Sequence, residues 1–547
     1  MSRVGMTILG ALALAPFAPV GHAGAPPHLG PTTLDRSPLA VNPIDVYSGM
    51  HNQVVIETAD SIAKIAAYNG DIYYVSNGVW PGATTDYPAM AMYQKSYDAL
   101  NNTYGPKGYG KILGYQNARK YAYKGIIPAS DGVFTAGLRQ PTQSPTDAVL
   151  DVWEHDQNQL IPRHSLVLST GANTEFTNVL RGPTASADDD YVFVTGGTLG
   201  AVLGLAGLPL GDEDFLVARF KYDAVNGFTG SADPNNYLQF GTSQFEELFT
   251  GVYDPDTNGL YVVGKTSGDL CAAYPTKAGL QCRDKSGLDA VIAGIGNEAG
   301  KLKLKWLLQF GSSGDDDLAK SVALYRNPAD ATDSRLFIAG ATNRDFTVPN
   351  GAYLYENPAT NNIHYQDAFL VSVALDASGN LAQGDPLQIV DVWGGDYGDI
   401  AGAVVITGDD VMVAGHHGGA EGHIDMCDRT EPSPGSDLQP NTPANNPFGT
   451  GNFASNDRID LSTPYIYTYD AVTGARLAEH EILNPTNPAA PIGDTGEQIM
   501  GIALDSAGRI HVAGQVVHSG ATLAFKGARG TGYNNDCSDG LLGVFTP

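Results

Sequence analysis

Phe193-Val194-Thr195-Gly196 is one of seven copies of a phrase in which an apolar pair is followed by a small residue and then by Gly or a similar residue. The first copy is Tyr74-Val75-Ser76-Asn77, and the seven copies end at Asn77, Gly137, Gly196, Gly264, Gly340, Gly415 and Gly514. Short β-rich runs that recur at such regular intervals are typical of propeller blades. We therefore predict an all-β fold, a single seven-bladed β-propeller with four antiparallel strands in each blade.

Residues 289–346 show the pattern of strands around one copy. Short alternating runs are separated by turn residues over Asp289–Ala293, Leu304–Gly311, Ala319–Tyr325 and Leu336–Thr342. This alternation favours antiparallel strands. With the related segments Asp214–Ala218 and Asp367–Val371, the stretch resembles the seven-bladed bacterial β-propeller repeat family (SBBP-type repeats). The resemblance implies the fold and an exported protein, and it carries over no catalytic residue.

The two ends of the sequence offer a way to close the propeller. Asp539–Phe545 reads as the third strand of the last blade, so that blade lacks a fourth strand. Gln53–Glu57 is a spare strand that precedes the first blade. Pairing it with the last blade would remove an exposed strand edge, so we predict that this N-terminal strand closes the ring.

The chain of 547 residues is strongly acidic, with 59 Asp and Glu against 31 Lys and Arg and a formal net charge of −28. Affinity for nucleic acid rests on Lys and Arg at phosphates, and an anionic membrane surface repels an acidic protein. The charge therefore argues against a nucleic-acid partner, and it favours solubility or basic partners.

The first residues are organised like a secretory signal. Arg3 precedes an apolar run over Met6–Ala18, and Gly21-His22-Ala23 fits a cleavage site. We predict a signal peptide over 1–23, an extended Pro-rich leader over 24–44 and the propeller over 45–547. The apolar run is too short to cross a bilayer. We therefore expect an exported protein that does not span the membrane and is periplasmic, at the cell surface or extracellular.

Four cysteines in an exported chain indicate two disulfides. Cys271 and Cys282 would close a small loop, which leaves Cys427 and Cys537 to pair with each other. All four follow a copy of the phrase, which supports this pairing. A cysteine metal site is the alternative, and the chain lacks the C-x-x-C spacing that such a site usually has.

Length variation is concentrated in the connectors that follow the phrase. The longest insertion, in the sixth blade, runs over about 416–460. These connectors emerge on one face of a propeller, and binding residues concentrate on loops held by a rigid scaffold. We therefore predict that a protein or glycan partner binds at this insertion-bearing face. Neutral drift in loop length is the alternative.

An acidic residue recurs just before the first strand of six blades, at Asp60, Glu175, Glu247, Asp317, Asp399 and Glu497. Such a carboxylate can accept backbone N–H bonds and lock neighbouring blades together. A second interpretation is a ring of carboxylates at the mouth of the central channel, which would bind a hard cation such as Ca²⁺.

Two further segments contain potential metal ligands. Asp254-Pro255-Asp256-Thr257-Asn258-Gly259 begins like a calcium-binding loop, but Lys265 stands where the loop needs Glu, which favours a plain turn. His416, His417 and His423 could bind copper or zinc together, and surface histidines are the alternative.

The sequence contains no nucleophile elbow, P-loop, dinucleotide fingerprint or haem attachment motif. We therefore predict an exported non-catalytic propeller that acts as a binding, scaffold or surface-assembly protein through the insertion-bearing face. The alternative is a propeller enzyme, a hydrolase or a metal-dependent lyase or oxidoreductase, with its site at the channel mouth. An enzyme would need converging titratable groups with shifted pKa values. A binding protein would need an exposed apolar or aromatic patch, for which the Tyr-rich stretch Tyr87–Tyr123 is a candidate.

Overall fold

The structure is a computed structural model, and its description covers most of the predicted strands and few of the long connectors. The described residues are 61–79, 88–98, 103–104, 108–112, 118–141, 145–156, 159–182, 191–204, 211–275, 277, 279–282, 287–298, 300–311, 315–328, 330, 333–342, 366–394, 399–417, 463–481, 495–506, 508–518 and 538–545. Within them the chain is all-β, apart from the short helix α1 (Leu270–Ala273) and the 3-10 turns Val202–Gly204 and Pro234–Asn236.

The strands follow one another in groups, numbered here in chain order. Group 1 contains β1 (Ser61–Tyr68), β2 (Asp71–Val79), β3 (Pro88–Asp98), β4 (Thr103–Tyr104) and β5 (Gly108–Ile112). Group 2 contains β6 (Ala118–Ala129), β7 (Gly132–Pro141), β8 (Asp147–Asp156) and β9 (Gln159–Leu168). Group 3 contains β10 (Thr174–Arg181), β11 (Tyr191–Thr198), β12 (Asp214–Asp223), β13 (Gly227–Thr229) and β14 (Tyr237–Phe240).

The remaining groups complete the chain. Group 4 contains β15 (Glu246–Asp254), β16 (Gly259–Thr266), β17 (Leu280–Cys282), β18 (Gly287–Glu298), β19 (Lys301–Phe310) and β20 (Asp315–Asp316). Group 5 contains β21 (Leu318–Arg326), β22 (Ser334–Thr342), β23 (Asp367–Leu375) and β24 (Leu387–Trp393). Group 6 contains β25 (Ile400–Thr407), β26 (Asp410–His417), β27 (Thr463–Asp470) and β28 (Arg476–Glu481), and group 7 contains β29 (Thr495–Leu504), β30 (Ile510–His518) and β31 (Ser538–Phe545).

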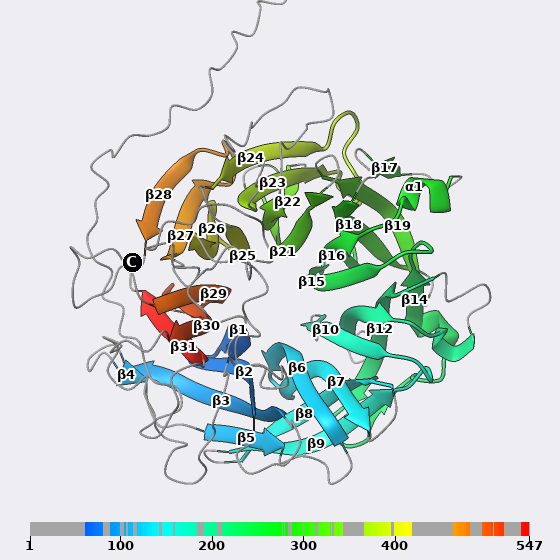
Figure 1. Ribbon diagram of the computed structural model, residues 1–547, viewed down its shortest axis with the longest axis vertical. Coiled ribbons are helices and arrows are strands. Elements are labelled where there is room, and N and C mark those ends of the chain that lie inside the picture. The colour runs from blue at the N-terminus through cyan, green and yellow to red at the C-terminus, as the bar shows by residue number, and fades with distance from the viewer. Residues whose placement is uncertain are drawn as a thin grey trace, which may run out of the picture. The chain divides into compact units, whose positions relative to one another are not determined.

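Every copy of the repeated phrase lies in the second strand of its group, as predicted. These strands are β2, β7, β11, β16, β22, β26 and β30. Groups 5 and 6 are antiparallel four-stranded sheets in the order β21-β22-β23-β24 and β25-β26-β27-β28 (Figure 1). The prediction of several four-stranded antiparallel sheets is therefore confirmed.

Other groups depart from the four-strand pattern. In group 3 the outer strand is split, and both β13 and β14 pair with β12. In group 4, β17 and β20 add short parallel pairings. The fourth strands β5 and β9 share the parallel pair Tyr109–Gln159, which joins groups 1 and 2 into one nine-stranded sheet. This pairing covers part of two strand edges that would otherwise present unpaired backbone groups.

The first strand of each group packs against the first strands of its neighbours. Strand β10 packs against β6 and β15, β21 against β15 and β25, and β29 against β25 and β1. Strand β1 also packs against β6. Glycine permits the close approach of β6 and β10, because a Cβ on Gly125 would lie only 2.7 Å from the Cα of Asn178.

Apolar side chains from consecutive groups fill the spaces between them. Phe134 and Leu150 of group 2 share one core cluster with Phe176 and Leu216 of group 3. The ring of Phe134 also meets Tyr222 edge to face, with centroids 5.0 Å apart. Burial of one such side chain contributes about 1.5–3 kcal/mol to stability. The apolar residues of the phrase therefore serve packing between groups.

Several predicted segments lie outside the described residues. They are the signal peptide over 1–23, the leader over 24–44, the closing strand Gln53–Glu57 and nearly all of the insertion over about 416–460. Strand β31 occupies the third position of group 7, as predicted. Over the ranges that the structure describes, no helix has the length and apolar character needed to cross a membrane.

Candidate binding site beside the first strands

Each first strand contains a β-bulge at the same place. In β10 it lies between Phe176 and Asn178, level with the final Gly196 of the phrase. The extra residues of the seven strands are Ala63, Lys124, Thr177, Phe249, Lys320, Gly402 and Met500. In group 1 the bulge aligns Ser76, and not Asn77, with the final Gly of the other copies. The first copy of the phrase therefore begins one residue earlier than the sequence predicts.

The recurring acids occupy two kinds of position. Glu175 and Glu247 are the second residues of β10 and β15, whereas Asp317 and Asp399 directly precede β21 and β25. Asp60 and the side chain of Glu497 lie outside the described residues.

The strand register adds an acid that sequence reasoning missed. Leu318 pairs with Ala341, and the corresponding pair in group 4 is Glu247 with Lys265. The residue of group 4 that is level with Asp317 is therefore the preceding one, Glu246. Two consecutive Glu residues conceal this equivalence in the sequence.

Glu175 and Glu247 belong to a set of charged side chains that we call the rim cluster, formed by Lys124, Glu175, Glu213, Glu247 and Lys265. Lys124 Nζ lies 2.6 Å from Glu175 Oε1, and Lys265 Nζ lies 3.3 Å from Glu247 Oε2. These four side chains are 19–36% exposed, so solvent reaches the cluster.

Glu213 is the titratable centre of the rim cluster. Burial raises the pKa of Glu213 to about 8, and the charges of Glu175 and Glu247 act in the same direction against those of Lys124 and Lys265. The Glu213 carboxyl is therefore mainly protonated at neutral pH and can donate a hydrogen bond, while the side-chain oxygens of Glu175 and Glu247 beside it can accept hydrogen bonds.

Two half-buried aromatic rings adjoin the rim cluster. Lys265 Nζ lies 5.7 Å from the ring centroid of Phe245 and 5.4 Å from that of Phe249. The ring of Phe249 also contacts a second lysine, Lys320, whose Nζ lies 4.3 Å from the ring centroid. The surface thus combines aromatic faces with hydrogen-bond donors and acceptors, a combination suited to amphipathic polar ligands.

Asp317 has a different environment, since it meets another acid at the boundary between groups. A Cβ placed on Gly311 would lie 2.6 Å from Asp317 Oδ2 and 2.8 Å from Asp289 Oδ1. Both carboxylates are buried. The two acids therefore approach each other beside this glycine, one from β18 and one from the start of β21.

The neighbouring boundaries repeat this arrangement. Asp214 and Glu246 meet at Gly241 in the same way, and Asp367 interacts electrostatically with Asp399. Burial raises the pKa of Asp367 to about 8, with Asp399 adding to the effect, and burial raises the pKa of Glu246 to about 7. We call Asp214/Glu246, Asp289/Asp317 and Asp367/Asp399 the carboxylate pairs.

A backbone hydrogen bond accompanies the carboxylate pairs. The amides of Thr174, Glu246, Asp317 and Asp399 donate to the carbonyls of Thr146, Glu213, Leu288 and Gln366, respectively, at 2.6–2.9 Å. In each case the residue whose carbonyl accepts the bond directly precedes an Asp near the start of the third strand of the preceding group.

Glutamine side chains hold two of these aspartates. Gln309 Nε2 donates to Asp289 Oδ2 at 2.5 Å and to the Gly268 carbonyl at 2.9 Å. Gln239 makes the same bonds to Asp214 and Gly200, at 2.7 and 3.1 Å. The carboxylate pairs are therefore part of the packing between groups, and Asp317 and Asp399 lie within that packing.

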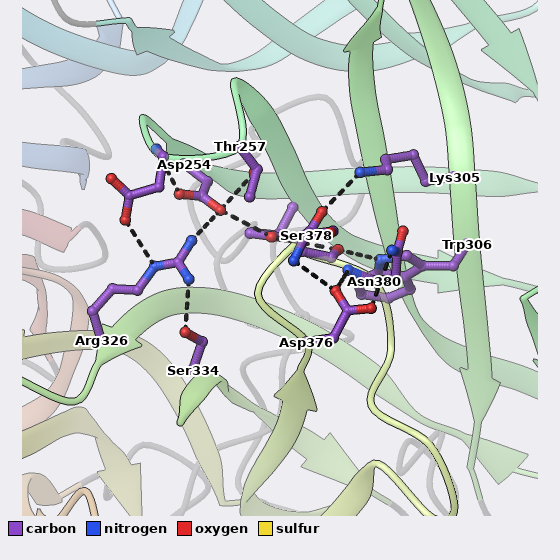
Figure 2. Close-up of polar contacts among 12 residues, drawn as sticks. Asp254, Thr257, Lys305, Trp306, Arg326, Ser334, Asp376, Ser378 and Asn380 are labelled. Atoms are coloured by element: carbon purple, nitrogen blue, oxygen red, sulfur yellow. Dashed lines mark hydrogen bonds and ion pairs between the residues drawn. The ribbon is translucent and has the colours of Figure 1, made fainter. Parts of the chain in front are cut away.

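The segment that resembles a calcium loop forms a hairpin turn between β15 and β16, with Asn258 at φ 49°. Figure 2 shows the Asp254 carboxylate in contact with side chains of groups 4 and 5. Asp254 Oδ2 accepts from Arg326 Nη2 at 2.5 Å, from Thr257 Oγ1 at 2.7 Å and from Tyr261 OH at 3.0 Å. The carboxylate thus joins β15 to the end of β21.

A second contact in Figure 2 joins the same two groups. The turn Asp376–Asn380 lies against β19, where Trp306 Nε1 donates to the Gly379 carbonyl at 2.9 Å and Lys305 Nζ to the Ser378 carbonyl at 2.9 Å. Sequence reasoning did not single out Trp306 or Arg326, because their partners lie 72 or 73 residues away.

Cys271 and Cys282 form a disulfide with an S–S distance of 2.14 Å, as predicted. Cys427, Cys537, His423 and the side chain of His417 lie outside the described residues, and His416 is buried in β26. In the described ranges no three His, Cys, Asp or Glu side chains are grouped so that they could hold a metal ion.

No family model and no curated protein matches the chain. Similar solved structures include the periplasmic gluconolactonase PpgL of Pseudomonas aeruginosa, which is 12% identical over 77% of this chain and 85% of that chain, with a TM-score of 0.41. A putative 6-phosphogluconolactonase from Bacteroides fragilis is 9% identical over the same shares, with a TM-score of 0.38. A carbohydrate-active enzyme of family AA12 from Trichoderma reesei is 12% identical over 90% of this chain and 94% of that chain, with a TM-score of 0.34. These neighbours are β-propeller proteins, and likeness at this level assigns no activity.

Proposed function

We propose that each strand group is one blade of a closed seven-bladed propeller of the SBBP type. Each first strand packs against those of two other groups, and β1 packs against both β6 and β29. The approach is close, since a Cβ on Gly501 of β29 would lie 3.0 Å from Ile65 Cγ2 of β1. Gln53–Glu57 would then supply the fourth strand of group 7.

Two N-terminal truncations test this closure. A chain that starts at residue 58 loses the proposed closing strand, and we expect its melting temperature to fall by about 4 °C or more. A chain that starts at residue 45 keeps the strand and loses only the leader, so its melting temperature should equal that of the mature protein. Equal melting temperatures for both truncations would contradict closure by this strand.

We propose that the protein is an exported, non-catalytic binding or scaffold protein whose rim cluster and adjoining Phe245 and Phe249 contact a glycan or a protein segment. The observation that carries the proposal is a solvent-accessible cluster in which ion pairs, a protonated carboxyl and two aromatic rings converge. Export rests on the signal pattern of residues 1–23.

One observation favours the enzyme alternative. Glu213 has a pKa of about 8 next to Glu175 and Glu247, and a protonated carboxyl beside ionised carboxylates is the arrangement that general acid catalysis uses. In that case the rim cluster would cleave a ligand as well as bind it.

Binding to an array of neutral, amine-bearing and acidic oligosaccharides, and to a peptide library, tests both proposals. We expect Glu247→Gln to weaken binding of the best ligand about tenfold or more, since it removes a charged hydrogen-bond acceptor. Glu298→Gln is the matched control, because Glu298 is an exposed partner of Lys303 outside the cluster. If the wild-type protein cleaves the ligand and Glu213→Gln does not, the enzyme alternative is established. If Glu247→Gln and wild type bind the ligand equally well, a binding site at the rim cluster is contradicted.

A further inference from the structure

Three polar side chains outside the set that forms the rim cluster meet from strands far apart in the sequence. Lys64 of β1 places Nζ 3.4 Å from Thr250 Oγ1 of β15, and Asn178 Nδ2 of β10 donates to the same oxygen at 2.9 Å. Lys64 and Thr250 are 186 residues apart in the sequence. All three follow the bulges of their strands, so the bulges bring these side chains to the same level.

The hydrogen bonds of this cluster leave donors in excess. The Thr250 hydroxyl oxygen accepts from both Lys64 and Asn178, so its own hydrogen points elsewhere. An ammonium group has three hydrogens and an amide group has two. No described residue accepts the remaining hydrogens of Lys64 or that of Thr250. The cluster therefore offers more donors than acceptors, and Asn178 Oδ1 is the one side-chain acceptor it retains.

The charge of Lys64 is likewise uncompensated by the described residues, where no carboxylate lies within 4.0 Å of its Nζ. Lys64 as a whole residue is half-buried, and the surrounding protein desolvates its amine and lowers the pKa of Lys64 to about 8. The group remains mainly protonated at neutral pH, and a desolvated cation is stabilised by a bound anion.

We propose that Lys64, Thr250 and Asn178 form a site for a small oxyanion, such as the carboxylate group of a short organic acid. Such an ion has only acceptors and matches the donors that converge here. None of the three residues belongs to the rim cluster, and the proposal extends beyond the proposed function.

Sodium acetate is the probe, titrated into the mature protein in a zwitterionic buffer at pH 7. A bulky sodium sulfonate salt keeps the ionic strength constant. We expect acetate to raise the melting temperature with a saturating concentration dependence, because it binds the folded state alone. The Lys64→Met variant should lose about tenfold to a hundredfold in acetate affinity, the effect of one charged hydrogen bond.

Two further variants make the result decisive. Lys303→Met removes the same charge from an exposed side chain and should keep the full acetate response. Thr250→Val keeps the Lys64 charge and removes the shared hydroxyl, so it should weaken acetate binding even if Lys64→Met fails to fold. An equal acetate response in wild type, Lys64→Met and Thr250→Val would overturn the proposal, as would a wild-type protein that gives no saturable response.

Discussion

The two ends of β21 hold group 5 against group 4 by opposite electrostatic means. At its start Asp317 meets Asp289, two buried acids of like charge. At its end Arg326 binds the buried carboxylate of Asp254. An ion pair is favourable when both partners are charged, whereas two adjacent buried carboxyls are tolerated best when one of them holds a proton. One junction thus brings together two groups of like charge at one end of β21 and two of opposite charge at the other.

The pKa values at the described junctions support this contrast. Burial raises the pKa of Asp254, but hydrogen bonds from Thr257 and Arg326 and the charge of Arg326 outweigh it and hold the pKa below its ordinary value. The carboxylate pairs show the reverse, since burial raises the pKa of Asp367 to about 8 and that of Glu246 to about 7.

The largest expected effect is a loss of stability as the pH rises. A raised folded-state pKa contributes stability that is complete below the ordinary pKa and is lost as pH rises through the folded value. This window extends from about pH 4 to pH 8 for Asp367 and from about pH 4.5 to pH 7 for Glu246. We expect the free energy of unfolding to fall by up to about 1.4 kcal/mol per pH unit for each group. Urea unfolding at pH 4.5, 6 and 8 measures this decrease in the free energy of unfolding.

Asp367→Asn sharpens this prediction, because asparagine keeps the shape and does not titrate. The variant should lose part of the pH dependence and gain stability relative to wild type at pH 8. If its stability falls with pH as steeply as that of wild type, Asp367 is not a proton-binding member of a pair.

At the other end of β21, Arg326→Met should destabilise the protein by about 2–3 kcal/mol at pH 7, because it leaves the Asp254 carboxylate buried without its cation. We place the value below the range of about 3–5 kcal/mol for fully buried ion pairs, since Arg326 is 28% exposed. The double variant Asp254→Asn with Arg326→Met should recover part of the loss. Full additivity of the two single variants in chemical denaturation would show that the pair is not coupled.

A smaller effect is expected where the turn Asp376–Asn380 lies on β19. Trp306→Phe removes the donor to the Gly379 carbonyl and should cost about 1–2 kcal/mol. Lys305→Met removes an exposed bond to the neighbouring Ser378 carbonyl and should cost less than about 0.5 kcal/mol. The hydrogen-exchange rate of the backbone amides in the turn Asp376–Asn380 should rise in Trp306→Phe and stay unchanged in Lys305→Met.

The strands were predictable because their signal is local. The apolar pair and small residue of Phe337-Ile338-Ala339-Gly340 fit a buried strand, and β22 contains the whole phrase. The copy that ends at Asn77 was predicted one residue too late. Ser76 and Asn77 are both small and polar, and the bulge that separates their roles depends on the pairing partner.

The candidate sites were less accessible to sequence reasoning, because they depend on contacts between groups. Glu247 drew attention by its spacing, but the strand register makes Glu246 the residue level with Asp317. Glu213 carries no motif, and its raised pKa arises from burial and from charged residues of three groups. Lys64, Asn178 and Thr250 meet only because three first strands lie close together in the fold. No spacing rule relates Lys64 to Thr250, which are 186 residues apart in the sequence.

The backbone bond between consecutive groups has a consequence for how this chain can change. The residue that donates it is Thr174, Glu246, Asp317 or Asp399, so three different side chains accompany one unchanged main-chain contact. A junction made by peptide groups does not depend on which two modules it joins. A group that is duplicated, exchanged or diverged in sequence keeps its means of attachment, and its side chains are left free to acquire new roles.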